Sequence, residues 1–318
     1  MGQPAANPVG GERQGTNWLN DVSLAAFLDL QRLMDWKGGF FTASFGWKSG
    51  DKLGLTPESI GNQFPVQLST GGNATRLVRL AVGQELFDND AELVGGRIIT
   101  GEDFATIRLA CTSLNQAICA NPIAGNQSIS FPTYPNAVWG GRLKYKPGIS
   151  WYAQIGAYLV YPDFRNPNDH GVNFGAPEGS GVLTLGEYGY IVGSYRGKPG
   201  LPGKYKIGGY YDGEKLRDLK TNQPERGTWG IYGLAEQMVY AEDDKYDQGL
   251  SAWLALSYAP PDRNRIEFMA AGGLSYKGIF PGRPRDALSF ISSYGRYSSD
   301  LRAGQRARRT NADRRAAA

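Results

Sequence analysis

The chain has 318 residues, with 44 glycines and 18 tyrosines, and it has no apolar run of about 18 residues that could form a transmembrane helix. Its formal charge of +4 comes from the C-terminal segment 302–318, whose six arginines and one aspartate leave the rest of the chain close to neutral. The charge excludes a basic nucleic-acid surface on the body of the chain, and the composition favours many short strands and turns.

Alternating apolar and polar residues predict a series of strands along the chain. In 150–161, for example, Trp151 and Ile155 alternate with Tyr152 and Gln154. Period two over about eight to twelve residues is the strand signature, and these lengths fit a tilted membrane span. The predicted strands include 40–47, 75–87, 91–99, 137–145, 150–161, 204–211, 249–258 and 266–277. We expect about twelve strands between residues 21 and 295.

Long and short connections alternate between these strands. The long ones are 48–73, 100–135, 162–180 and 212–227, with a middling one at 193–203, and the short ones are the turns at 88–90 and 146–148. Compact soluble domains rarely carry several structureless loops of this size. The alternation is typical of an all-β antiparallel transmembrane barrel with short periplasmic turns and long outer loops.

The two cysteines are Cys111 and Cys119, and the one histidine is His170. The even count and short spacing predict a disulfide in an oxidising compartment such as the periplasm, with two unpaired thiols as the alternative. Two cysteines and a distant histidine do not make a metal-ligand set, so we expect no metal and no cofactor.

No catalytic constellation stands out. His170 lies in a polar loop, and the sequence has no Gly-x-Ser-x-Gly motif. Glu102 and Asp103 are adjacent in sequence, which says nothing about the carboxylate separation that glycoside hydrolysis needs. We therefore expect no enzyme.

Several motifs together resemble the carbohydrate-selective porins of Gram-negative outer membranes, the OprB type. They are residues 17–24 with 36–39, the pair Gly96-Arg97 followed by 101–105, Cys111 to Cys119 followed by Asn121-Pro122, residues 132–135 with Trp139-Gly140, and residues 203–211. The resemblance covers about residues 7–300. It implies passive diffusion of small sugars such as glucose across the outer membrane, with outer-membrane lipid around the barrel, no nucleic-acid partner and a homo-oligomer as one option.

Strand parity and the family-like motifs suggest a set of pore-lining candidates. A sugar path needs hydrogen-bond donors and acceptors for hydroxyl groups and aromatic faces for the apolar side of the ring. The candidates are Arg79, Arg97, Glu102, Asp103, Arg142, Lys144, Tyr152, Gln154 and Glu187. The resemblance and the length of loop 105–135 also imply that this loop folds inward and narrows the pore.

The ends of the chain differ from the family pattern. The resemblance implies a barrel of about sixteen strands, of which we expect about twelve here. We expect residues 1–20 to be a leader remnant without a signal peptide, residues 21–300 to be the barrel domain, and the Arg/Ala-rich segment 301–318 to be disordered or out of frame. A genuine basic arm is the alternative for the tail.

Two other functions compete with a sugar porin. One is a soluble all-β sugar-binding protein, although the apolar faces of 250–258 and 266–276 do not suit a soluble surface. The other is a non-functional porin fragment, because unpaired strand edges facing lipid would cost several kcal/mol for each unsatisfied group.

Overall fold

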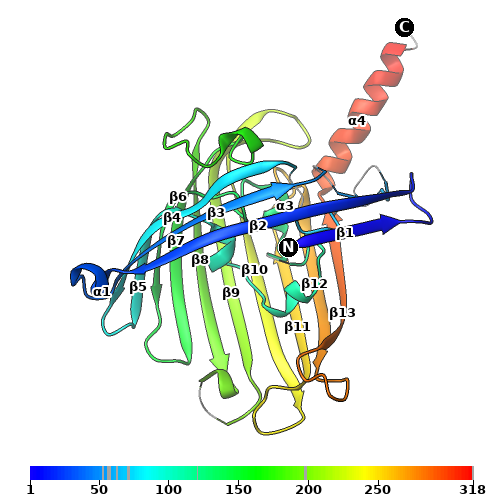
Figure 1. Cartoon of the computed structure of the whole chain (residues 1–318). Helices are drawn as coiled ribbons and strands as arrows, with labels where there is room; N and C mark the ends of the chain where they lie inside the picture. The colour runs from blue at the N-terminus through cyan, green and yellow to red at the C-terminus, as the bar shows by residue number, and fades with distance from the viewer. Residues whose placement is uncertain are drawn as a thin grey trace.

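In the part of the chain that it describes, the computed structural model is one antiparallel sheet of 13 strands that curls around a central region (Figure 1). The structure describes residues 1–316 except 52–53, 56–58, 62–63, 70–71, 120 and 197–198. Strands adjacent in sequence are adjacent in the sheet throughout. The strands are β1 (Gly2–Asn7), β2 (Gly15–Asp29), β3 (Gly39–Ser49), β4 (Ala74–Leu86), β5 (Ala91–Ile98), β6 (Val138–Tyr145), β7 (Trp151–Val160), β8 (Gly181–Val192), β9 (Gly203–Arg217), β10 (Pro224–Ala241), β11 (Gly249–Tyr258), β12 (Ile266–Lys277) and β13 (Ala287–Tyr297).

Helices are short and lie in the connections, apart from one at the C-terminus. They are α1 (Leu30–Met34), α2 (Thr100–Asp103), α3 (Ala124–Ser128) and α4 (Ser299–Ala316), with 3-10 turns η1 (Leu109–Thr112), η2 (Pro167–Asp169) and η3 (Gly193–Arg196). In the described part of the chain, no helix combines the length and the apolar character needed to cross a membrane.

The period-two pattern sorts side chains onto two faces of the sheet, as predicted. On β7, Tyr152 and Gln154 point into the curve and are 2% and 6% exposed. Ile155, the residue that follows Gln154, points out and is 56% exposed. Ile207 of β9 is similarly exposed on the outer face. An apolar outer face and a polar inner face are what a transmembrane barrel requires and what a soluble sandwich avoids.

Aromatic rings pair across neighbouring strands near both ends of the outer face. At the short-turn end, Trp151 lies between Tyr145 and Tyr188, with ring centroids 5.8 and 5.9 Å away. At the opposite end, the ring centroids of Trp229 and Tyr258 are 6.1 Å apart. Aromatic belts of this kind sit at the two membrane interfaces of a barrel.

The connections divide into a short-turn end and a long-loop end of the sheet. The turn between β4 and β5 holds Phe87, Asp88 and Asn89 at positive φ, a conformation that Asp and Asn tolerate well. The long connections 50–73, 99–137 and 161–180 all lie at the other end. The expected long connection 212–227 is wrong, because β9 continues to Arg217 and β10 begins at Pro224, which leaves only 218–223. Parts of the expected connections 48–73 and 193–203 lie outside the described residues.

The two ends of the chain differ: strand pairing begins at Gly2, whereas the last strand ends at Tyr297 and a helix follows. The twelve strands β2–β13 agree with the expected number, and β1 adds one more within residues 1–20, where we expected a leader remnant. The segment expected to be disordered forms α4 instead, since Arg and Ala are strong helix formers. Its expected origin out of frame stays a prediction.

Candidate functional site

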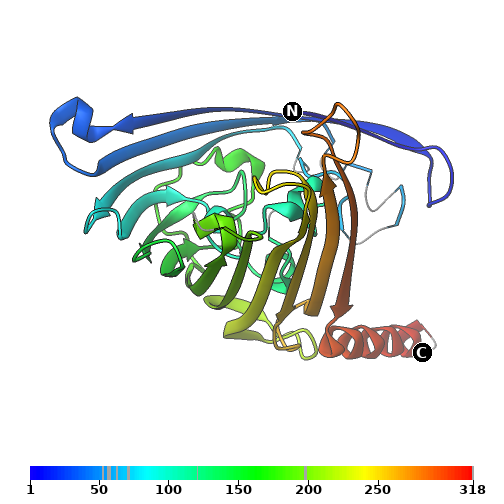
Figure 2. The same ribbon diagram turned by 90° about the horizontal axis from the view of Figure 1, so that it is seen from below.

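The long connection between β5 and β6 folds into the curve of the sheet. Seen along the curve, the sheet forms an arc with this segment inside it (Figure 2). The structure joins Cys111 and Cys119 of this inner loop, residues 99–137, by a disulfide that closes a short ring within it. The expectation that the loop turns inward is confirmed by the contacts of its apolar side chains.

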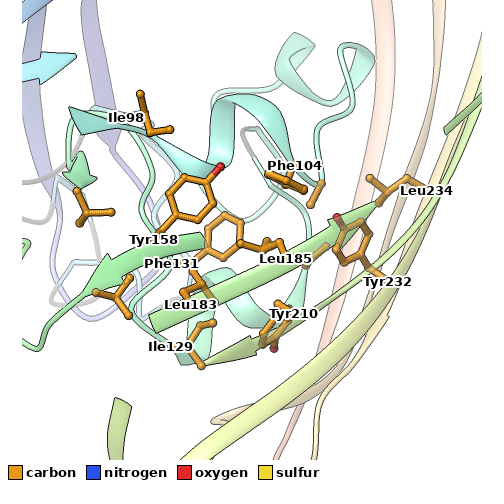
Figure 3. Packing of buried hydrophobic residues seen from close by; sticks show 14 of the residues in the cluster. Ile98, Phe104, Ile129, Phe131, Tyr158, Leu183, Leu185, Tyr210, Tyr232 and Leu234 are labelled. Carbon is orange, nitrogen blue, oxygen red and sulfur yellow. The ribbon is translucent and has the colours of Figure 1, made fainter. Parts of the chain in front are cut away.

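Those side chains pack on one wall of the barrel. Phe104, Ile129 and Phe131 of the inner loop lie against residues of β7, β8, β9 and β10 (Figure 3). The wall residues of this cluster include Tyr158, Leu183, Leu185, Tyr210, Tyr232 and Leu234. Phe104 and Phe131 have no exposed surface, so water is excluded between the loop and this wall.

A buried carboxylate fixes the start of the loop to the same wall. Glu187 of β8 is 4% exposed and accepts a hydrogen bond from the backbone N–H of Ala105 at 2.8 Å. It also accepts hydrogen bonds from the hydroxyl groups of Tyr152 at 2.7 Å and Tyr232 at 3.0 Å, and from Nε2 of Gln154 at 3.0 Å. Four donors on one buried carboxylate compensate for the loss of its hydration.

Ion pairs attach the loop to the neighbouring strands. Arg142 of β6 pairs with Glu92 of β5 and, at 3.1 Å from its Nε, with Oδ1 of Asp103 in α2. Arg79 of β4 pairs with Glu102, which directly precedes Asp103 in α2, and the N–O distance is 2.7 Å. Two adjacent carboxylates of α2 therefore reach guanidinium groups on two different strands.

The two pairs differ in their access to water. The side chain of Arg142 is 5% exposed, whereas those of Arg79 and Glu102 are 22% and 43% exposed. Burial raises the pKa of Glu102 above the ordinary range, an effect that nearby Arg79 opposes, and burial likewise raises the pKa of Asp103 against the pull of Arg142. The Arg79–Glu102 pair is thus the charged pair that faces the open part of the lumen.

The predicted pore-lining residues all gather around the loop, but they fall into two groups. Arg79, Glu102, Asp103 and Lys144 keep exposed or half-buried side chains, whereas Arg97, Arg142, Tyr152, Gln154 and Glu187 are buried. Arg97 donates to the backbone carbonyls of Ala137 at 2.9 Å and Asn173 at 3.0 Å. This placement gives Arg97 contacts that hold two long loops together.

A cavity of about 800 Å³ opens at the long-loop end, in front of the inner loop. Its lining includes Asp21, Lys48 and Arg76 on the strands, and Tyr134 and Arg165 on the loops. Sequence reasoning missed these five residues: the predicted strand ended at residue 47, just before Lys48, the loops offered no parity for Tyr134 and Arg165, and Asp21 and Arg76 were not singled out although each lies in a segment that the sequence did identify. An inner-face position for Lys48 could have been found by extending the alternation of β3 by one residue.

Comparisons with known proteins agree on one family. The family described as "Carbohydrate-selective porin, OprB family" matches residues 13–317. Porin B of Pseudomonas aeruginosa is 26% identical over 96% of this chain and 70% of its own length.

Solved structures show the same likeness. A high-pH structure of OprB from Pseudomonas putida is similar with a TM-score of 0.86 and 25% identity, over 94% of this chain and 74% of that one. A low-pH structure of the same protein is similar with a TM-score of 0.55 and 21% identity, over 87% of this chain and 70% of that one, a likeness that concerns the fold.

Proposed function

Because the chain belongs to the OprB family of carbohydrate-selective porins, we propose that small neutral sugars such as glucose diffuse through it along the open side of the inner loop. The protein is an outer-membrane porin of an all-β barrel fold, a channel rather than an enzyme. Selectivity in such a channel comes from its width and from the groups that line its narrowest part.

One observation carries the proposed path. The inner loop packs mainly on the wall formed by β7–β10 and reaches β11 and β12, and the cavity opens on the other side of the loop, toward β2–β4. The Arg79–Glu102 pair joins β4 to the start of the loop on this side, and the cavity lined by Asp21 and Lys48 lies toward the long-loop end. A guanidinium and a carboxylate side by side offer donors and acceptors to sugar hydroxyl groups without a strong net charge.

The apolar outer face supports contact with lipid. Ile155, Ile207 and Leu254 are each about half exposed or more on this face, between the two aromatic belts. A homo-oligomer would cover part of the same face, and cross-linking in native membranes would distinguish a monomer from a trimer. A chain that stays monomeric in buffer without detergent would overturn the membrane location.

Liposome swelling tests the sugar path directly. The chain, reconstituted in phospholipid vesicles, is expected to admit glucose faster than gluconate, an anion of similar size. Equal rates would contradict selectivity for neutral sugars, and the absence of any swelling would contradict the pore itself.

A further inference from the structure

We propose that Phe27 and Phe40 form an aromatic platform on the lumen wall, on which the apolar face of a pyranose ring lies while its hydroxyl groups meet Thr42, Arg79 and Glu102. This inference rests on the proposed sugar path and names the part of that path that distinguishes a ring from an open chain. The residues come from β2, β3, β4 and α2, and they meet toward the short-turn end of the lumen.

The alternation of β2 places Phe27 inside the barrel. Leu19 is 1% exposed and Asp21 lines the cavity, and Phe27 has the same parity as both. Leu24, of opposite parity, is exposed on the outer face. The register pairs Phe27 with Thr42 of β3, so these two side chains are direct neighbours on the inner wall.

Phe27 is an uncovered inner-face aromatic residue in the stretch Val22–Leu28 of β2, whose side chains are all exposed. Its side chain is 66% exposed, whereas Tyr152 and Tyr158 on the covered wall are at most 2% exposed. The Phe27 ring stacks on Phe40, with centroids 5.8 Å apart and an interplanar angle of 22°. An exposed ring that stacks on a second ring offers a flat apolar surface to the C–H face of a sugar.

Phe40 gives the platform a fixed base. It packs against the core cluster below the inner loop, and a Cβ added to Gly83 of β4 would lie 2.0 Å from its ring. The ring of Phe40 therefore lies directly over the backbone of the neighbouring strand. The platform consists of one anchored ring and one exposed ring nearly parallel to it.

Polar groups border the platform on one side. Nε of Arg79 donates to Oγ1 of Thr42 at 3.0 Å, and Nη1 of Arg79 donates to Oε2 of Glu102 at 2.7 Å. A pyranose with equatorial hydroxyl groups presents C–H bonds on its faces and hydroxyl groups around its rim. Stacked rings beside a guanidinium–carboxylate pair match that division of surface.

The test compares glucose with sorbitol, an acyclic polyol of the same carbon count that lacks a flat C–H face. In vesicles containing the full chain, Phe27→Leu is expected to lower the ratio of glucose to sorbitol permeation by about three- to tenfold, because leucine keeps the apolar volume and loses the π face. Phe27→Tyr is expected to retain most of the native ratio. The matched control is Phe45→Leu, at an exposed position on the outer face of β3.

The outcomes distinguish the aromatic platform from the proposed diffusion of sugars, on which it rests. Native vesicles that exclude glucose would overturn both. Native vesicles that admit glucose, together with an unchanged ratio in Phe27→Leu or an equal loss in Phe45→Leu, would overturn the platform alone. A lower ratio in Phe27→Leu with a retained ratio in Phe27→Tyr supports it.

Discussion

Two walls of one sheet meet the lumen in different ways. The covered wall, β7–β10, presents Tyr158, Leu183 and Tyr232 to the inner loop and excludes water. The open wall, β2–β4, presents Thr42 and Arg79 to the remaining lumen. Both walls have the same alternation and the same apolar outer face, so the difference arises from the side chains that the inner loop places against one of them.

This contrast shows how a barrel can be both rigid and permeable. The covered wall holds the loop with a dry aromatic core and a carboxylate that accepts four hydrogen bonds. The open wall keeps charged and hydroxyl groups within reach of a solute. Substitutions on the covered wall should therefore change stability and pore width, and those on the open wall should change selectivity.

The largest effect is expected from Phe131→Ala, which removes a fully buried ring between the loop and the covered wall. Truncating a buried Phe costs about 3–5 kcal/mol, so the loop should detach and the single-channel conductance in KCl should rise. Planar-bilayer recordings measure the conductance, and Phe290→Ala on the outer face of β13 is the control. Unchanged conductance would show that the loop does not depend on this core.

A smaller effect is expected from Glu187→Gln. The amide retains one acceptor but turns donors toward the hydroxyl groups that now donate to the carboxylate, which should lower stability by about 1.5–3 kcal/mol. Thermal unfolding in detergent, followed by circular dichroism, measures the loss. Glu225→Gln, at a half-exposed ion pair with Arg263, serves as the control, and an equal shift in both variants would remove Glu187 from its anchoring role.

Arg79→Ala tests the open wall. The pair with Glu102 is partly exposed, so its loss should cost less than about 1 kcal/mol of stability. The freed carboxylate of Glu102 should instead make the pore more cation-selective and slow glucose. Reversal potentials across a KCl gradient measure the first effect, with Arg283→Ala in an exposed turn as the control. A native reversal potential together with native glucose flux would contradict a role in the path.

The smallest effect is expected from pH. Burial raises the pKa of Glu102 and Asp103, so both carboxyl groups should take up protons at a higher pH than ordinary carboxyl groups do as the pH falls. The lumen then loses negative charge, and anion selectivity should increase. Reversal potentials across a KCl gradient, recorded over a series of pH values, measure this increase. The change with pH should be smaller in a Glu102→Gln variant than in the native protein, and an identical change would assign the titration to other groups.

Much of the fold follows from local pattern. Period-two alternation predicted β7, β11 and β12 nearly to the residue and assigned their outer faces correctly. It also placed Arg79, Arg142 and Glu187 on the inner face, because side-chain direction in a strand depends only on parity. The motif set indicated the porin family, and the length of segment 100–135 indicated an inner loop.

Tertiary structure alone decided which inner-face residues meet water. Arg142 and Glu187 have the parity of pore-lining residues, yet the inner loop and its neighbours bury them. On the other wall, Phe27 has inner-face parity too, and it stays exposed. Parity is a property of each strand by itself, but burial depends on where a loop distant in sequence packs, and no local pattern encodes that choice.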